Sequence, residues 1–130
     1  MDIEAIQPEI AKIAEKYRLD FVVLFGSQAT GRTHPKSDVD IGVIGHDKFD
    51  IIKLMTDMDK IFKRDDVTAV DLSRASPTLM YAIVHDGKLL YERERALFMK
   101  WRFYAIRTWM ETDWLRQLSY KNLIEWAKQI

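Results

Sequence analysis

The pattern of hydrophobic and polar residues predicts one helix and two strands in the first 45 residues. Hydrophobic side chains recur at steps of three and four residues up to Tyr17, and Pro8 suits a first helical turn, so we predict an amphipathic helix over residues 8–17. The uninterrupted apolar run LDFVVLF, residues 19–25, indicates a strand that is buried on both faces. A second strand is predicted for the alternating segment DVDIGVIG, residues 38–45.

The middle of the chain alternates between helical and strand patterns. Residues 49–62 place hydrophobic side chains at helical spacing, with Asp50 available as a cap. We predict a third strand at 67–73, a helix at 76–87 between a Ser-Pro pair and a glycine, and a last strand or extended arm at 88–92. The predicted fold class is therefore α/β, of the α+β kind.

The C-terminal region follows a different pattern. From Arg93 onward the sequence has neither glycine nor proline, which predicts one long helix or two helices broken near residue 119. Two hydrophobic stripes lie on nearly opposite sides of the projected helix: Leu97, Trp101, Tyr104, Ala105 and Leu115 on one, and Met99, Phe103, Ile106, Met110 and Trp114 on the other. One small core cannot bury both, so the second stripe either packs on the terminal helix around Leu123, Ile124 and Trp126 or forms an oligomer or partner interface.

Composition narrows the class of protein. The 130 residues are 48% hydrophobic and 31% charged, which is typical of one folded domain. Twenty basic and twenty acidic residues give no net charge, which argues against nucleic acid as the main partner. The chain has no cysteine, no signal sequence pattern and no stretch of the roughly 18 apolar residues that a membrane helix needs, so we expect a cytoplasmic protein without a membrane partner.

The second predicted strand carries two carboxylates on one face. Asp38 and Asp40 are two residues apart, so their side chains point the same way and repel each other unless a divalent cation lies between them. Oxygen ligands of this kind suit magnesium or manganese. Asp71 lies among apolar residues of the third strand and would join the pair if the two strands are neighbours. The alternative is that Asp38 and Asp40 are surface acids, with Asp38 capping the turn PKSD.

A glycine and a serine follow the first predicted strand. Gly26 lets the backbone approach a ligand closely, and free amides beside the Ser27 hydroxyl form a cradle for phosphate oxygens. Phosphates on this turn and a metal on the Asp-x-Asp strand are the arrangement that phosphoryl or nucleotidyl transfer requires, and Asp71 could complete a second metal site and accept the proton of the attacking hydroxyl. Ser37 either caps the loop before Asp38 or contacts the ligand.

These motifs resemble a known family. GSQATG followed by SDVDIGV and by VDLS resembles the DNA polymerase β-like nucleotidyltransferase superfamily, over residues 26–71. The segment SPTLMYAIVHDGKLLYERE extends the likeness over residues 8–95 to the minimal nucleotidyltransferases (MNT), in particular the antitoxins of HEPN/MNT toxin–antitoxin systems. Thr30 departs from the pattern, since many relatives have arginine there.

The resemblance implies a nucleotidyltransferase fold with a small mixed sheet flanked by helices. It implies a minimal nucleotidyltransferase domain over residues 1–95 and a C-terminal helical extension over residues 96–130, within the same compact domain. It also implies AMP transfer from ATP, with two Mg²⁺ ions, onto a tyrosine hydroxyl of a partner HEPN ribonuclease toxin in a hetero-oligomer. The residues carried over are Gly26, Ser27 and Ser37 for ATP and Asp38, Asp40 and Asp71 for metal and catalysis.

Two alternatives to protein adenylylation stay open. A small-molecule nucleotidyltransferase of the aminoglycoside-modifying kind would use the same chemistry, although such relatives usually carry a substantial second domain to shape the acceptor pocket. A steric antitoxin would bind its toxin without catalysis. The presence of all three acids in the sequence favours an enzyme.

Overall fold

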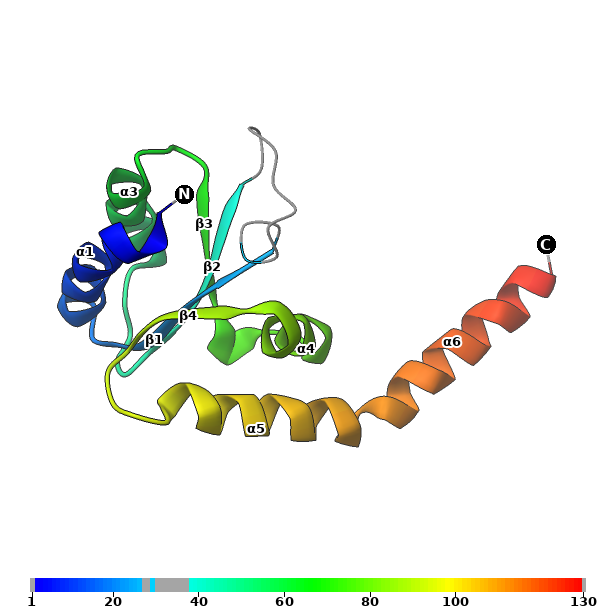
Figure 1. The fold of residues 1–130 in the computed structure, drawn as a ribbon. Helices are drawn as coiled ribbons and strands as arrows, with labels where there is room; N and C mark the ends of the chain where they lie inside the picture. Colours follow the sequence, from blue (N-terminus) through cyan, green and yellow to red (C-terminus); the bar gives the residue numbers. More distant parts are fainter. Residues whose placement is uncertain (1, 27–28, 30–37, 130) are drawn as a thin grey trace.

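A computed structural model describes residues 2–26, 29 and 38–129 of the chain, as one α/β unit with a C-terminal helical arm (Figure 1). The elements in chain order are α1 (Ile3–Lys16), β1 (Leu19–Phe25), β2 (Val39–Gly45), α3 (Ile51–Phe62), β3 (Val67–Asp71), a 3₁₀ turn η1 (Leu72–Arg74), α4 (Pro77–Asp86), β4 (Lys88–Glu92), α5 (Leu97–Glu111) and α6 (Asp113–Lys128). The predicted α/β fold class is confirmed, and KLLYE forms a strand.

Two element boundaries differ from the sequence prediction. The first helix begins at Ile3, because the Asp2 side chain caps it by accepting from the Ala5 amide, and Pro8 lies inside the helix. The third strand ends at Asp71, whose side chain caps η1.

The strands form one mixed sheet in the order β3-β2-β1-β4. β1 pairs antiparallel with β2 and with β4, while β2 and β3 run parallel, with α3 as the crossover between them. The predicted small mixed sheet flanked by helices is therefore confirmed. Because β1 and β2 are antiparallel, the end of β1 and the start of β2 lie at the same end of the sheet.

Each face of the sheet has its own hydrophobic core. On one face, residues of β1 and β2 such as Leu24 and Ile41 pack against α1 and α3. On the other face, Phe21 and Val23 of β1 pack against η1, α4 and α5 (Figure 1). β1 is consequently buried on both faces, as its uninterrupted apolar run predicts.

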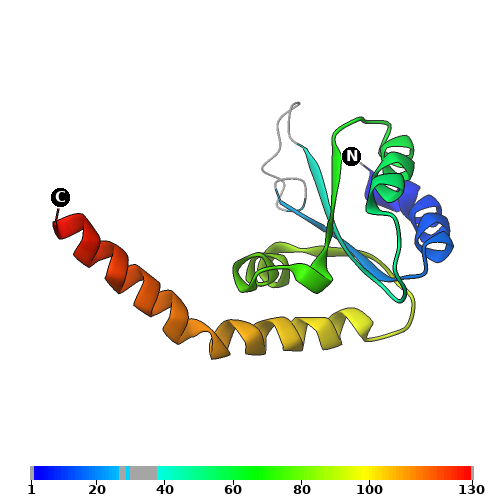
Figure 2. The ribbon, with the colours of Figure 1, turned by 180° about the vertical axis from the view of Figure 1, so that it is seen from behind.

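The C-terminal region forms two helices, and they break at Thr112 instead of near residue 119. α5 packs on the body through Phe98, Trp101 and Ala105, whereas α6 has no buried residue. Figures 1 and 2 show α6 leaving the body as an arm. Because Leu123 and Trp126 are 58% and 60% exposed, the expectation that the second stripe packs on the terminal helix is wrong for this structure.

Among the described residues, none of the helices is both long and apolar enough to cross a membrane. The division of the chain at residue 95 stays a prediction.

Candidate active site

Gly26 and Asp40 lie in direct contact at one end of the sheet. Gly26 follows β1 with φ of +74°, a backbone conformation that residues with a Cβ atom rarely adopt. A Cβ atom at Gly26 would lie 2.6 Å from Oδ2 of Asp40, so a side chain there would collide with the carboxylate. The Gly26 carbonyl accepts a hydrogen bond from the Ala29 amide (3.2 Å). The end of β1 and the Asp-x-Asp segment therefore lie side by side.

Asp40 is held in an unfavourable setting for a negative charge. It is partly buried, and burial raises the pKa of its carboxyl group, with the nearby charge of Asp38 raising it further. Within the described part of the chain, Asp40 has no ion-pair partner. A divalent cation bound to the two carboxylates would offset both the burial of the Asp40 charge and its repulsion with Asp38. Carboxylate oxygens are the ligands that Mg²⁺ prefers. The two residues therefore fit a metal-binding role.

Asp38 lies near a second charged group that the sequence reading did not identify. Continuing the parallel register by one residue from Val39 and Val67 places Asp38 opposite Asp66. Arg64 holds Asp66 through two hydrogen bonds of 2.7 Å and lowers the pKa of Asp66, and a contact with Asp38 lowers it further. The charge of Asp38 in turn helps to raise the pKa of Arg64. We call Gly26, Asp38, Asp40 and Asp66 the acidic end of the sheet.

Asp71 does not join the acidic end, which corrects the predicted triad. In the parallel register Asp40 pairs with Thr68, whereas Asp71 pairs with Val43, three residues further along. At about 3.3 Å per residue this is roughly 10 Å along the strand, and the odd step turns the side chain to the opposite face. The Asp71 carboxylate instead accepts hydrogen bonds from the Ser73 amide (3.0 Å) and hydroxyl (2.8 Å). No three described residues of the types His, Cys, Asp and Glu lie close enough to hold a metal ion together.

Thr68 is the residue that the register brings beside Asp40, and the sequence reading missed it. Its side chain is exposed and shares the face of Asp40. The alternation of β3 places Asp66 and Thr68 on one face and Asp71 on the other, but only the pairing with β2 shows which of the two faces carries Asp40. Ser27 and Ser37, which were predicted to bind ATP, lie outside the described residues.

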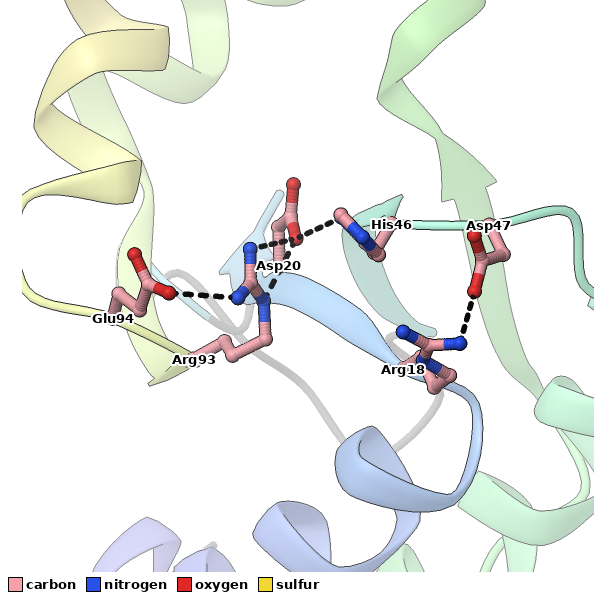
Figure 3. A network of polar contacts seen from close by, with 6 residues as sticks. All are labelled: Arg18, Asp20, His46, Asp47, Arg93 and Glu94. Atoms are coloured by element: carbon pink, nitrogen blue, oxygen red, sulfur yellow. Dashed lines mark hydrogen bonds and ion pairs between the residues drawn. The ribbon is translucent and has the colours of Figure 1, made fainter.

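The opposite end of the sheet carries a network of ion pairs (Figure 3). Arg93, after β4, pairs with Asp20 of β1 (3.1 Å) and with Glu94 (2.9 Å), and His46 lies 4.0 Å from Asp20. Next to it, Arg18 pairs with Asp47 at 2.7 Å. We call these six residues the ion-paired end: Arg18, Asp20, His46, Asp47, Arg93 and Glu94. Arg93 therefore ties β1 to β4 and lies far from Asp40.

Comparison with known proteins identifies the family of this chain. The chain belongs to the family described as "Polymerase beta, Nucleotidyltransferase", whose model matches residues 8–96.

The chain is also similar to individual curated proteins. A protein of Shewanella oneidensis described as "Protein adenylyltransferase MntA" is 37% identical over 81 residues, which are 57% of this chain and 55% of the relative. The chain thus spans about half the length of that curated relative.

Two solved structures share the fold. One, described as a "toxin-antitoxin with AMP-PNP", has a TM-score of 0.78 and 26% identity, covering 91% of this chain and 98% of that one. A chain from a complex of tri-AMPylated Shewanella oneidensis HEPN toxin with MNT antitoxin has a TM-score of 0.75 and 23% identity, covering 95% and 99%.

Proposed function

We propose that this protein is an antitoxin nucleotidyltransferase that transfers AMP from ATP to a tyrosine hydroxyl of a HEPN ribonuclease toxin and thereby silences it. The observation that carries the proposal is the contact between the Gly26 turn and the Asp40 carboxylate, with Asp38 on the same face. The family membership supports the chemistry. The 37% identical MntA adenylyltransferase and the toxin–antitoxin structure with AMP-PNP support the acceptor and the nucleotide.

The proposed roles follow from the positions of the residues. Asp38 and Asp40 would hold Mg²⁺, which would supply positive charge to neutralise the phosphates. The backbone at Gly26, with Ser27, receives the triphosphate, because the glycine leaves room beside the Asp40 carboxylate. Ser37 is a further candidate for ATP binding.

In the reaction the tyrosine oxygen forms a bond to the α-phosphorus, the bond from that phosphorus to the oxygen bridging the α- and β-phosphates breaks, pyrophosphate leaves, and the phenolic proton passes to solvent. Asp71 lies away from Asp40 and is not proposed as the base. The role of the chain is to hold the nucleotide in line with an acceptor that the partner protein supplies.

A protein acceptor suits the chain better than a small molecule. Of the two helices described after β4, α5 packs on the body and α6 leaves it (Figure 1). Nothing in the described region forms the second domain that would enclose a small acceptor beside Asp40. An acceptor that brings its own surface fits this open arrangement.

A steric, non-catalytic antitoxin is the second candidate. It is favoured by one observation, namely that Asp71 does not complete a set of three carboxylates with Asp38 and Asp40. The two candidates make opposite predictions for a variant that lacks the acid pair.

The test is intact mass spectrometry of a HEPN toxin partner after incubation with this protein, ATP and Mg²⁺. We expect a gain of one or more AMP masses that is absent with the Asp38→Ala, Asp40→Ala variant and retained with the matched control Asp71→Asn. If the double variant still neutralises the toxin fully in cells, the steric candidate replaces the enzymatic one. If ATP binds but no AMP reaches the toxin, a small-molecule acceptor is favoured.

A further inference from the structure

The helix α6 is exposed around its whole circumference although it is rich in large hydrophobic residues. Seven of its side chains are hydrophobic and exposed: Trp114 61%, Leu115 46%, Leu118 47%, Tyr120 67%, Leu123 58%, Ile124 37% and Trp126 60%. At 100° per residue these positions surround the helix instead of forming one stripe. A helix that is apolar on all sides is normally buried, and apolar patches of this size mark binding surfaces.

The exposed surface continues onto α5. Met99, Phe103, Ile106 and Met110 follow one another at steps of four, three and four residues, and their side chains are 54%, 66%, 38% and 70% exposed. They lie away from Phe98, Trp101 and Ala105, which hold α5 on the body. We call α6 together with these four residues of α5 the arm surface.

The junction between α5 and α6 has contacts that hold the arm in one direction. The Arg116 guanidinium lies 3.4 Å from the centroid of the Trp109 ring and donates to the Thr112 hydroxyl (2.7 Å) and the Trp109 carbonyl (2.5 Å). Trp109 stacks on Tyr81 of α4 with ring centroids 4.4 Å apart. Through this stack, the direction of α6 is tied to the body.

The arm stands apart from the sheet. Both views show α6 continuing outward from the end of α5, away from the body, and rising to about the height at which β1 ends and β2 begins (Figures 1 and 2). A partner that rests on α6 must therefore be large enough to reach from the arm to the end of the sheet that carries Gly26 and Asp40, which a protein can do. A second copy of this chain on α6 would compete with such an acceptor for the same residues.

The charge of the arm indicates the chemistry of its occupant. Residues 97–129 of α5 and α6 contain six basic and three acidic side chains, a net charge of +3 in a chain that is neutral overall, and α6 itself contributes three basic and two acidic side chains, a net charge of +1. α6 spans about 24 Å, which is long enough for one side of a standard interface of roughly 800 Å² per partner. The arm surface is complementary to a helical protein that carries an apolar stripe with acidic side chains along its edges.

We infer that the arm surface is the docking site for the acceptor protein, a helical partner whose apolar stripe is edged by acidic residues. This inference rests on the proposed function. The arm provides affinity and orientation, while the acidic end provides the chemistry, so that binding and transfer are separable by mutation.

The test measures toxin binding by calorimetry with a HEPN toxin and AMP transfer as a function of toxin concentration. In the variant Trp114→Gln, Trp126→Gln we expect the Kd for the toxin to rise by about 100-fold, because buried tryptophans dominate interface energies. AMP transfer should fall at low toxin concentration and recover when the toxin approaches saturation. The matched control Glu9→Gln, Lys12→Gln changes two exposed polar residues of α1, outside the arm surface, and should leave Kd unchanged.

Two charge-reversal variants test the inference independently. Lys121→Glu with Lys128→Glu should slow association and raise Kd by about tenfold at low salt, and added salt should reduce that difference. Because the replaced side chains are exposed, these variants should keep the thermal stability of the parent protein.

The outcomes separate the docking inference from the proposed function. An unchanged toxin Kd in the tryptophan variant overturns the docking inference, whether or not AMP is transferred. If the parent protein is a dimer by light scattering, the variant is a monomer and toxin binding is unchanged, then a second copy occupies the arm. Tight toxin binding through the arm without Asp38- and Asp40-dependent AMP transfer would support docking and contradict adenylylation.

Discussion

The carboxylates at the two ends of the sheet have opposite electrostatic environments. At the ion-paired end, Asp20 and Asp47 each have an arginine within 3.1 Å, so their charges hold β1, β2 and β4 together. At the acidic end, Asp40 is partly buried beside Asp38, and both burial and the neighbouring charge raise its pKa. The first arrangement serves the fold, whereas the second costs stability and leaves oxygen atoms available for a ligand.

The largest expected effect comes from neutralising Asp40. In Asp40→Asn, AMP transfer to the toxin should fall by about 10²- to 10³-fold, because a proposed metal ligand is lost. The free energy of unfolding should stay the same or rise by about 0.5–1 kcal/mol, because the buried charge and its repulsion with Asp38 are removed. Chemical denaturation measures the second quantity. A clear loss of stability would mean that Asp40 serves the fold as Asp20 does.

Gly26→Ala tests the contact between the turn and the carboxylate. The φ of +74° and the 2.6 Å approach of the new Cβ atom to Asp40 Oδ2 should lower the free energy of unfolding by about 1–3 kcal/mol and reduce AMP transfer. Combining it with Asp40→Ala should recover part of the stability, because the collision is relieved while the backbone strain remains. A double-mutant cycle measures the coupling. Strictly additive effects would contradict the contact.

The variants Thr68→Asp and Asp71→Asn test which residue of β3 lies beside Asp40 of β2. Thr68→Asp places a third carboxylate beside Asp40 and should tighten Mn²⁺ binding about tenfold, at a cost of about 1 kcal/mol in the metal-free protein. Asp71→Asn should change Mn²⁺ binding little, since its carboxylate only caps η1. Calorimetric titration with Mn²⁺ compares the two variants. If Asp71→Asn lowered the affinity for Mn²⁺ by a larger factor than Thr68→Asp raised it, the predicted metal site of Asp38, Asp40 and Asp71 would be restored.

The same register explains what the sequence could and could not predict. The apolar run of β1, the glycine that ends it and the paired acids of β2 are local patterns, and each was placed correctly. Whether Asp71 or Thr68 lies beside Asp40 depends on which residues of β2 and β3 pair, and a shift of one residue moves every side chain to the other face. Nothing within VTAVDLS determines that pairing.

The two C-terminal helices also have features that the sequence alone does not predict. The break at Thr112 has no glycine or proline to announce it, and it is accompanied by contacts of the Thr112 hydroxyl with the Thr108 carbonyl and with Arg116. The two hydrophobic stripes were visible in the sequence. Which stripe faces the body was decided by the packing of Phe98 and Trp101 on Phe21, which is distant in the sequence.

The smallest expected effect lies at the ion-paired end. Arg93→Ala removes the pairs with Asp20 and Glu94, and because the Arg93 side chain is open to solvent, screening keeps the loss of unfolding free energy small, below that of the variants described above. AMP transfer should stay within about twofold of the parent protein, since no group at the acidic end is touched. Denaturation at low and high salt checks the electrostatic origin, because screening should shrink the difference. A large loss of transfer with stability intact would place Arg93 in the active site and remove the distinction between the two ends.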